Sequence, residues 1–290
     1  MITVKKIFII LASIFLLLSF SFLGLFIYEQ QMLNKEQEEI VDIFDEVIIT
    51  TPETEETKQP ETTDETQSSE TNTQPTETTQ QKPTNNTTQY TTPTAINIDK
   101  LLQKNKDVAG WIYLENSPLN YPFLFSTGNE YLRKNINGQK STAGSIYTYD
   151  NQVIESPDKI DKNVILYGHN MKNGTMFSYV NSLYKNSNYL KNGKNKYIFI
   201  YNKEHILKYQ IYSIYKNEKN SNFSQIYFKD DADFLNFCKT TYDRSIYKDF
   251  KPEFVADDTI LTLATCSSND SQTYRIILHA VLVETSENNY

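Results

Sequence analysis

The sequence of 290 residues predicts a mainly β domain with flanking helices, preceded by a transmembrane helix and a disordered stalk. Residues 96–290 contain short apolar segments separated by turns of Asn, Asp, Gly and Lys, a pattern typical of β-barrels and β-sandwiches. Residues 7–28 form an uncharged run that is long enough to cross a bilayer as a helix. Residues 51–95 hold almost no apolar side chains, which is typical of disordered segments.

The apolar run at residues 7–28 differs from a cleaved signal peptide. A signal peptide has a shorter apolar region that ends at a small-residue cleavage site, whereas this run ends in Gly-Leu-Phe-Ile-Tyr. Lys5 and Lys6 precede the run and several glutamates follow it, so the positive-inside rule places residues 1–6 in the cytoplasm. We therefore predict a single-pass protein of the cell membrane whose folded domain is extracellular.

Residues 29–50 are predicted to form a juxtamembrane helix, because their apolar side chains fall mostly on one stripe. The stripe contains Leu33, Ile40, Val41, Phe44, Val47 and Ile48. A helix of this kind could self-associate or lie on the membrane surface. The simpler interpretation, which we favour, is a helical extension of the anchor.

The segment 51–95 is rich in Thr, Glu and Pro and cannot bury enough apolar surface to offset the entropy of ordering. We expect a stalk that lifts the folded domain away from the membrane. Residues 1–95 carry 15 acidic and 5 basic side chains, whereas the whole chain has a net charge of −8. The folded domain is therefore slightly positive, and because it has no basic stripe we expect no binding to nucleic acid.

The predicted domain at 96–290 begins with a short amphipathic helix near Ile98 and contains a second helix within 228–247. In that second helix Phe234, Phe237, Cys238 and Thr241 recur at helical spacing, and Asp230 or Asp231 is suited to cap its start. The candidate strands are residues 111–114, 121–125, 144–149, 163–168, 196–201, 206–215, 259–265 and 274–284. Strand pattern alone leaves both a barrel and a sandwich open.

The sequence from Thr259 to Val283 places a cysteine at the end of a strand. Cys266 follows an apolar segment and precedes a short polar loop, so substrate can reach its thiol while a sheet fixes its position. Arg275 is the second residue of the next strand, and alternation puts it on the same face as Ile277 and His279. We expect Arg275 to point back toward Cys266, although a lone arginine at a strand start can also just extend to solvent.

A nucleophilic cysteine needs a base or a cation nearby, because its ordinary pKa leaves little thiolate at neutral pH. The three histidines are the candidate bases. His169 follows the apolar run 164–167 and should sit at a strand end, as Cys266 does. His205 is expected at an exposed hairpin tip, and His279 at a packed or lumen-facing position in mid-strand. His169 is therefore the preferred partner.

Several blocks of this sequence resemble the sortases, the thiol transpeptidases of Gram-positive cell envelopes. TLATC at 262–266 fits the sortase signature TLxTC, and Arg275 completes that pattern. NVILYGHNMKNGTMF at 163–177 is similar to the segment that presents the sortase histidine. DVAGWIYLENSPLNY at 107–121 and GQKSTAGSIY at 138–147 extend the resemblance, which covers roughly 97–284 and is closest to class B. It implies a closed eight-stranded β-barrel with a helix inserted between the sixth and seventh strands.

The resemblance also implies a function. Cys266 would be the nucleophile, His169 the general acid and base, and Arg275 the group that stabilises the oxyanion or holds the peptide. Residues expected to contact the peptide are Thr265, Ala264, Ser267 and Asn170, with the Ser267 N–H as a second oxyanion donor. The enzyme would cleave an NPQTN-like or LPxTG-like sorting signal of surface proteins after Thr, through a thioacyl-enzyme. The acceptor would be a peptidoglycan cross-bridge amine or a lipid-linked precursor, and neither metal nor cofactor is expected.

Two other functions remain open from the sequence. A cell-wall cysteine peptidase would hydrolyse the same kind of intermediate, although papain-like enzymes place the cysteine before the histidine, the reverse of the order here. A membrane-tethered scaffold without activity would have Cys266 buried or bridged to Cys238. Two cysteines do not make a disulfide framework, and Cys238 fits a buried position on its helix better.

Overall fold

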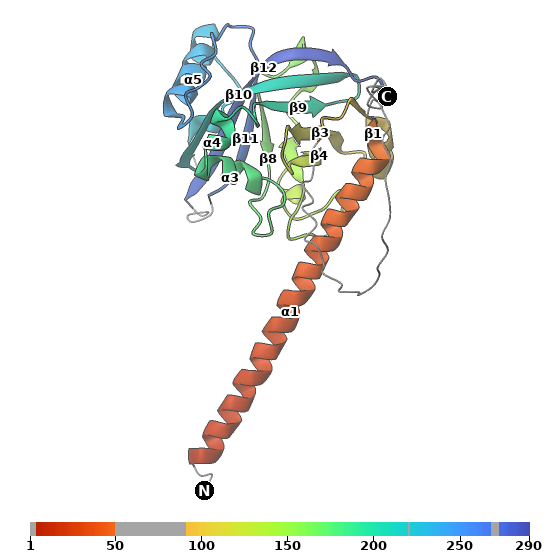
Figure 1. Cartoon of the computed structure of the whole chain (residues 1–290), viewed down its shortest axis with the longest axis vertical. Helices are drawn as coiled ribbons and strands as arrows, with labels where there is room; N and C mark the ends of the chain where they lie inside the picture. The colour runs from red at the N-terminus through yellow and green to blue at the C-terminus, as the bar shows by residue number, and fades with distance from the viewer. Residues whose placement is uncertain (1–3, 50–90, 220, 268–272) are drawn as a thin grey trace, which may run out of the picture.

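Eight strands of this chain close into one barrel, with the order β10-β12-β11-β8-β5-β4-β3-β9 (Figure 1). The computed structural model describes residues 4–49, 91–219, 221–267 and 273–290. The predicted stalk at 51–95 therefore lies almost entirely outside the described residues. Of the two architectures that the strand pattern allowed, the barrel is confirmed.

All eight predicted strands are present, with boundaries that differ by a few residues. Their bounds are β3 (Val108–Leu114), β4 (Asn120–Ser126), β5 (Ile146–Tyr149), β8 (Asn163–Tyr167), β9 (Tyr197–Tyr201), β10 (His205–Glu218), β11 (Ile260–Cys266) and β12 (Tyr274–Glu287). The short strands β6 (Ile154–Ser156) and β7 (Lys159–Ile160) pair with each other outside the barrel and were not predicted.

Side chains alternate between the interior of the barrel and its outer face, as expected for strands. In β12, Ile276, Leu278 and Ala280 belong to the interior core. The alternate residues Ile277 and His279 lie on the outer face, where they meet the elements that cover the barrel. Strand β11 pairs with β8 in parallel and with β12 in antiparallel orientation. The ends of β8 and β11 therefore meet at one edge of the barrel.

Helices cover the outside of the barrel. Their bounds are α2 (Ile98–Lys104), α3 (Ser178–Lys185), α4 (Asn188–Lys191) and α5 (Asp231–Arg244), with 3-10 turns η1 (Glu130–Leu132) and η2 (Asn222–Ser224). The two predicted helices correspond to α2 and α5, whereas α3 and α4 were not predicted. The side chain of Asp230 caps α5 by accepting from the N–H of Asp233.

Cys238 is a core residue, as the helical spacing predicted. It is fully buried where α5 packs against β10, β11 and β12, among Tyr212, Phe237 and Val281. Burial raises the pKa of its thiol to about 12, so it stays protonated at physiological pH. Both cysteines are free, and the bridge between Cys238 and Cys266 is absent.

His205 and His279, the two histidines that were not preferred as the base, occupy different environments. His279 is fully buried between the barrel and α5, and its ring is hydrogen-bonded to Thr262 Oγ1 (2.8 Å) and Tyr215 Oη (3.0 Å). It is packed, as predicted. His205 lies at the β9–β10 hairpin turn, as predicted: Tyr201 pairs with Ile206, and the Asn202 N–H donates to the His205 carbonyl (3.0 Å). It is half-buried and not exposed, because it is also the first residue of β10 and pairs with Glu287 of β12.

The predicted anchor and the juxtamembrane helix form a single helix, α1 (Val4–Val47). Its N-terminal part extends away from the barrel (Figure 1) and is long and apolar enough to cross a membrane, by length and composition. The apolar run and the segment after it are thus one continuous helix, and its role as a membrane anchor stays a prediction. Its C-terminal part also packs against the barrel and buries Leu33, Ile43 and Val47, so the folded unit includes part of the segment assigned to 29–50.

Candidate active site

The histidine and the cysteine are brought to the same edge by the parallel pairing of β8 and β11. Cys266 ends β11, and His169 comes two residues after the end of β8. Two hydrogen bonds extend the pairing beyond the strands: Gly168 N–H donates to the Ala264 carbonyl (3.3 Å), and Thr265 Oγ1 donates to the Gly168 carbonyl (2.8 Å). These bonds fix the backbone next to both reactive side chains.

Position 168 has no room for a side chain, so a glycine is required there. A Cβ atom built on it would lie 2.8 Å from the ring of Phe177, closer than real Cβ atoms approach other atoms. Phe177 is itself fully buried, and its N–H donates to the His169 carbonyl (2.8 Å). The loop that follows the histidine therefore folds back over Gly168, and only glycine permits that approach.

Arg275 lies directly opposite Cys266 in the antiparallel pair of β11 and β12. Residues opposite each other in such a pair project their side chains to the same face, with Cβ atoms about 5 Å apart. One guanidinium nitrogen of Arg275 donates to the carbonyl of its neighbour Tyr274 (3.0 Å), which orients the side chain. The arginine therefore faces the region of the cysteine, as the strand alternation predicted.

His169 is held by a backbone carbonyl. Its Nε2 lies 2.9 Å from the Leu132 carbonyl oxygen, and since a carbonyl only accepts, Nε2 carries the proton and Nδ1 of the neutral ring is free to accept one. Burial lowers the pKa of His169 and the charge of Arg133 lowers it further, while the carbonyl acts in the opposite direction. The imidazole is therefore neutral at neutral pH and can act as a base.

His169, Cys266 and Arg275 line one hollow on the outer face of the barrel. Its walls are largely aromatic: the ring of Tyr167 lies 5.5 Å from that of Tyr147 and 5.4 Å from that of Tyr149, centroid to centroid. Burial raises the pKa of Tyr167 to about 12, so the phenol remains neutral. The cysteine is half-buried and lines this hollow.

The four residues predicted to contact a peptide have different surroundings. Thr265 and Ala264 line the hollow, and both are buried. Asn170 donates from Nδ2 to the Cys266 carbonyl (2.9 Å) and so ties the histidine loop to the cysteine. The Ser267 N–H donates to the Tyr274 carbonyl (3.2 Å), because Ser267 continues the pairing with β12; this bond occupies the predicted oxyanion donor.

Sequence reasoning missed the aromatic wall of the hollow. Tyr147 and Tyr149 alternate in one strand, and Tyr167 precedes His169 by two residues, so each pair shares a face. That spacing was a usable signal. Asn129, Leu132, Lys219 and Phe223 come from connecting segments, including η1 and η2, whose positions only the fold determines.

A second hollow also includes Cys266 in its lining. Its lining comprises Pro118, Asn170, Met171, Lys172, Gly174, Ser178, Tyr179, Asn181, Ser182, Lys185, Cys266 and Ser267. Cys266 thus lines both hollows. Among the residues that the structure describes, this second lining contains two lysines and no carboxylate. Its charge therefore suits a molecule with anionic groups.

Comparison with known proteins identifies relatives of this chain. A family model for the sortase domain matches residues 122–283. Sortase B of Staphylococcus aureus (strain NCTC 8325 / PS 47) is 30% identical over 200 residues, which cover 68% of this chain and 78% of that protein. Sortase B of Listeria monocytogenes serovar 1/2a is 29% identical over 194 residues, covering 63% and 72% respectively.

Solved structures agree with this result. A Staphylococcus aureus sortase B–substrate complex superposes with a TM-score of 0.57 at 30% identity, covering 64% of this chain and 84% of that one. Clostridium perfringens sortase B superposes with a TM-score of 0.58 at 28% identity, covering 64% of this chain and all of that one. The barrel fold is therefore shared with these structures.

Proposed function

Because the chain belongs to the sortase family, we propose that it is a cysteine transpeptidase that joins surface proteins to a cell-wall amine. The observation that carries the proposal is the convergence of Cys266, His169 and Arg275 on one hollow, with Cys266 and Arg275 paired across two strands. The apolar part of α1 would anchor the enzyme in the cell membrane, with the barrel outside the cell.

In the first step the sulfur of Cys266 attacks the carbonyl carbon of the threonine in a sorting signal. The thiol proton passes to Nδ1 of His169, which is neutral and unprotonated at that atom, and then to the leaving nitrogen as the C–N bond breaks. A thioester and a free amine result. The guanidinium of Arg275 would stabilise the negative charge that develops on the carbonyl oxygen.

The donor peptide would lie in the aromatic hollow. One of the related structures is a sortase B–substrate complex, which supports a peptide as the ligand class. Tyr147, Tyr149 and Tyr167 offer apolar ring faces together with hydroxyl groups. The cations that line the hollow, Arg275 and Lys219, favour an uncharged NPQTN-like or LPxTG-like signal over a basic one.

The acceptor would enter through the second hollow. Its amine attacks the thioester carbon, the C–S bond breaks, and the proton of the amine returns through His169 to the cysteine sulfur. Lys172 and Lys185 would bind carboxylate or phosphate groups of the acceptor, which suits a peptidoglycan cross-bridge peptide or its lipid-linked precursor.

Intact mass spectrometry of the full chain in detergent tests the proposal. The wild type and Cys266→Ala would be incubated with NPQTN-like and LPxTG-like peptides, with and without an amine. A thioacyl adduct on the wild type alone, converted to an amide by the amine, supports transpeptidation. An acid product that never becomes an amide would identify a peptidase, and no adduct with any peptide would favour the scaffold.

A further inference from the structure

The helix that carries the membrane anchor is also part of the catalytic domain. In α1 the apolar run ends at Tyr28, and Leu33 is already buried against the barrel. The four residues between them span about 6 Å along a helix. The helix is continuous through this point. The barrel therefore begins within about one helical turn of the end of the anchor.

Apolar contacts hold the C-terminal part of α1 on the barrel. Ile43 and Val47 join a buried cluster with Ile96 and Trp111, and the ring of Phe44 stacks on that of Trp111 at 5.5 Å. Trp111 is fully buried, so the helix covers a large aromatic side chain that would otherwise face solvent. The docked helix is thus one wall of the core.

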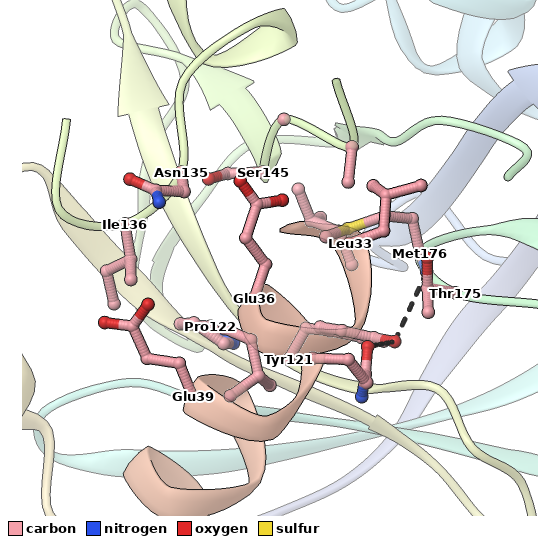
Figure 2. Close-up of a pocket in the computed structure, with 15 residues that line it drawn as sticks. Leu33, Glu36, Glu39, Tyr121, Pro122, Asn135, Ile136, Ser145, Thr175 and Met176 are labelled. Carbon is pink, nitrogen blue, oxygen red and sulfur yellow. Dashed lines mark hydrogen bonds between the residues drawn. The ribbon is translucent and has the colours of Figure 1, made fainter. Parts of the chain in front are cut away.

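Polar contacts fix the rotation of α1 about its axis. Glu36 accepts from Ser141 Oγ (2.7 Å), and Gln37 accepts through Oε1 from the hydroxyl of Tyr121 (3.0 Å). Asn137 donates to Glu39, one turn beyond Glu36 on the same face. Figure 2 shows Glu36 and Glu39 pointing from the helix toward Ser145, Asn135 and Ile136, which lie in the segment between η1 and β5.

The contacts of α1 reach the loop that follows the catalytic histidine. The hydroxyl of Tyr121 accepts from the N–H of Met176 (3.3 Å) while it donates to Gln37 (Figure 2). Met176 pairs with Asn170 across this loop, next to His169. A path of hydrogen bonds therefore runs from the anchor helix through Gln37 and Tyr121 to the loop of the active site.

The two ends of the segment that connects the anchor helix to the barrel lie next to each other. Strand β1 (Ile48–Ile49) continues from α1 and pairs with β2 (Ala95–Ile96). Thr94 N–H donates to the Ile49 carbonyl (2.9 Å). Residues 50–93 therefore begin and end at the same two-stranded sheet. They add nothing to the distance between the anchor and the barrel, which α1 alone sets.

We propose that docked α1 holds the active site at a fixed height next to the bilayer, and that 50–93 is an insertion and not a spacer. Gln37 lies nine residues beyond Tyr28, about 14 Å along the helix. The His169 loop is coupled to the helix at that height. Given the proposed function, the donor is a peptide presented close to the membrane surface. The active site is held within reach of that peptide by α1 and does not move on a flexible linker.

Two variants of the full chain in lipid vesicles test the proposal. One replaces residues 52–92 with Asn-Gly, a turn suited to close the β1–β2 hairpin. The other inserts seven helix-forming residues between Gln30 and Gln31, which raises the barrel by about 10 Å in nearly the same rotation. The donor is offered both as a soluble peptide and as a short peptide anchored by a lipid in the same vesicle.

We expect the deletion to leave turnover of both donors within a factor of two. The insertion should leave the soluble donor unchanged and lower turnover of the anchored donor about tenfold or more, because its effective concentration at the site falls. The reverse result, with the deletion harmful and the insertion neutral, would overturn the proposal. A wild type without turnover of the soluble donor would instead refute the proposed function, so the two failures differ.

A disulfide tests the docking itself. Ile48 and Ile96 are opposite each other, and both backbone groups of Ile96 bond to the side chain of Asn288 and not to Ile48. Such non-hydrogen-bonded pairs have Cα atoms about 4.5 Å apart, within the range of disulfides. Ile48→Cys with Ile96→Cys should crosslink in vesicles, seen as a joined peptide by mass spectrometry.

The matched control is Val41→Cys with Ile96→Cys, because Val41 is 49% exposed and lies two turns before Ile48. It should not crosslink. Equal crosslinking of the two pairs, or none in the first, would show that α1 is not docked in the membrane-bound protein.

Discussion

Cys266 and Arg275 are direct partners across the antiparallel strands β11 and β12, so a nucleophile and a permanent cation share one face of the barrel. The pairing results from the register of a hairpin, in which Leu263 faces Leu278 and Ala264 faces Ile277. A shift of one residue would turn one of the two side chains to the other face. The register therefore determines the chemistry of this edge.

Replacement of Arg275 should reduce acylation strongly. Arg275→Ala is expected to lower kcat/KM for the donor peptide about 100-fold, because the charge opposite the oxyanion is lost. Arg275→Lys should recover little of the rate, since the planar guanidinium is replaced by a point charge. Lys219→Ala, which removes another cation that lines the same hollow, is the matched control and should cost only a few-fold. Equal losses in both variants would contradict the assignment.

The pH profile of acylation should reflect the lowered pKa of His169. Burial lowers this pKa below the ordinary value of 6.5, so the neutral base persists at pH values where an exposed histidine is already charged. The midpoint of the decline in rate on acidification should therefore lie below pH 6.5. Rapid-quench measurement of the thioacyl-enzyme from pH 4.5 to 8 would show this, and a midpoint at or above that value would count against it.

His279 should make stability depend on pH without entering the reaction. Burial lowers its folded-state pKa to about 3 from 6.5, and Arg244 adds to this, so between these values only the unfolded state binds the proton. This stability is complete above pH 6.5 and is lost at about 1.4 kcal/mol per pH unit as the pH falls toward 3. Urea titrations at several pH values should show that slope in the wild type and a smaller slope in His279→Gln.

The bridge from Gln37 through Tyr121 to Met176 should act on the positioning of His169. Tyr121→Phe is expected to lower kcat several-fold with little change in the KM for the donor, because the loop loses a hydrogen bond. Gln37→Leu should have a smaller effect in the same direction. Since both act through one hydroxyl, the double variant should match Tyr121→Phe. Additive losses in ln kcat would show that the two side chains act separately.

Charge reversal in the second hollow should separate the two half-reactions. Lys172→Glu and Lys185→Glu are expected to leave thioester formation unchanged and to lower the amide-to-acid product ratio with an anionic peptide amine. With a small neutral amine the ratio should not change. Lys191→Glu, an exposed site that does not line either hollow, is the control. Loss of thioester formation in the lysine variants would place this hollow on the donor side instead.

Local pattern was sufficient for much of this structure. Short apolar segments bounded by turn residues predict strands, and all eight barrel strands were recovered in that way. Length and absence of charge predict the apolar helix that begins at Val4. The positions of His169 and Cys266 at strand ends also follow from local pattern, because each comes where an apolar run gives way to polar residues.

Other features depended on pairings between distant segments. Alternation assigns a residue to a face but says nothing about which strand lies beside it, so the parallel contact of β8 with β11 was decided by barrel closure. The hydrogen bond of the Ser267 N–H also depended on a distant segment, because the acceptor is the Tyr274 carbonyl of β12. The loop residue Leu132, whose carbonyl fixes the tautomer of His169, is far from that histidine in sequence.

The anchor helix shows most clearly which features follow from the sequence and which depend on the tertiary structure. The sequence by itself determined that residues 7–28 are apolar, that most of 29–50 is helical, and that 51–95 lack the apolar side chains of a core. Only the tertiary structure decided that the helix covers Trp111 and that Ile49 meets Thr94. An amphipathic stripe predicts that one face of the helix will be buried. The surface that buries it is built from residues far along the chain, and becomes available only when the barrel has closed.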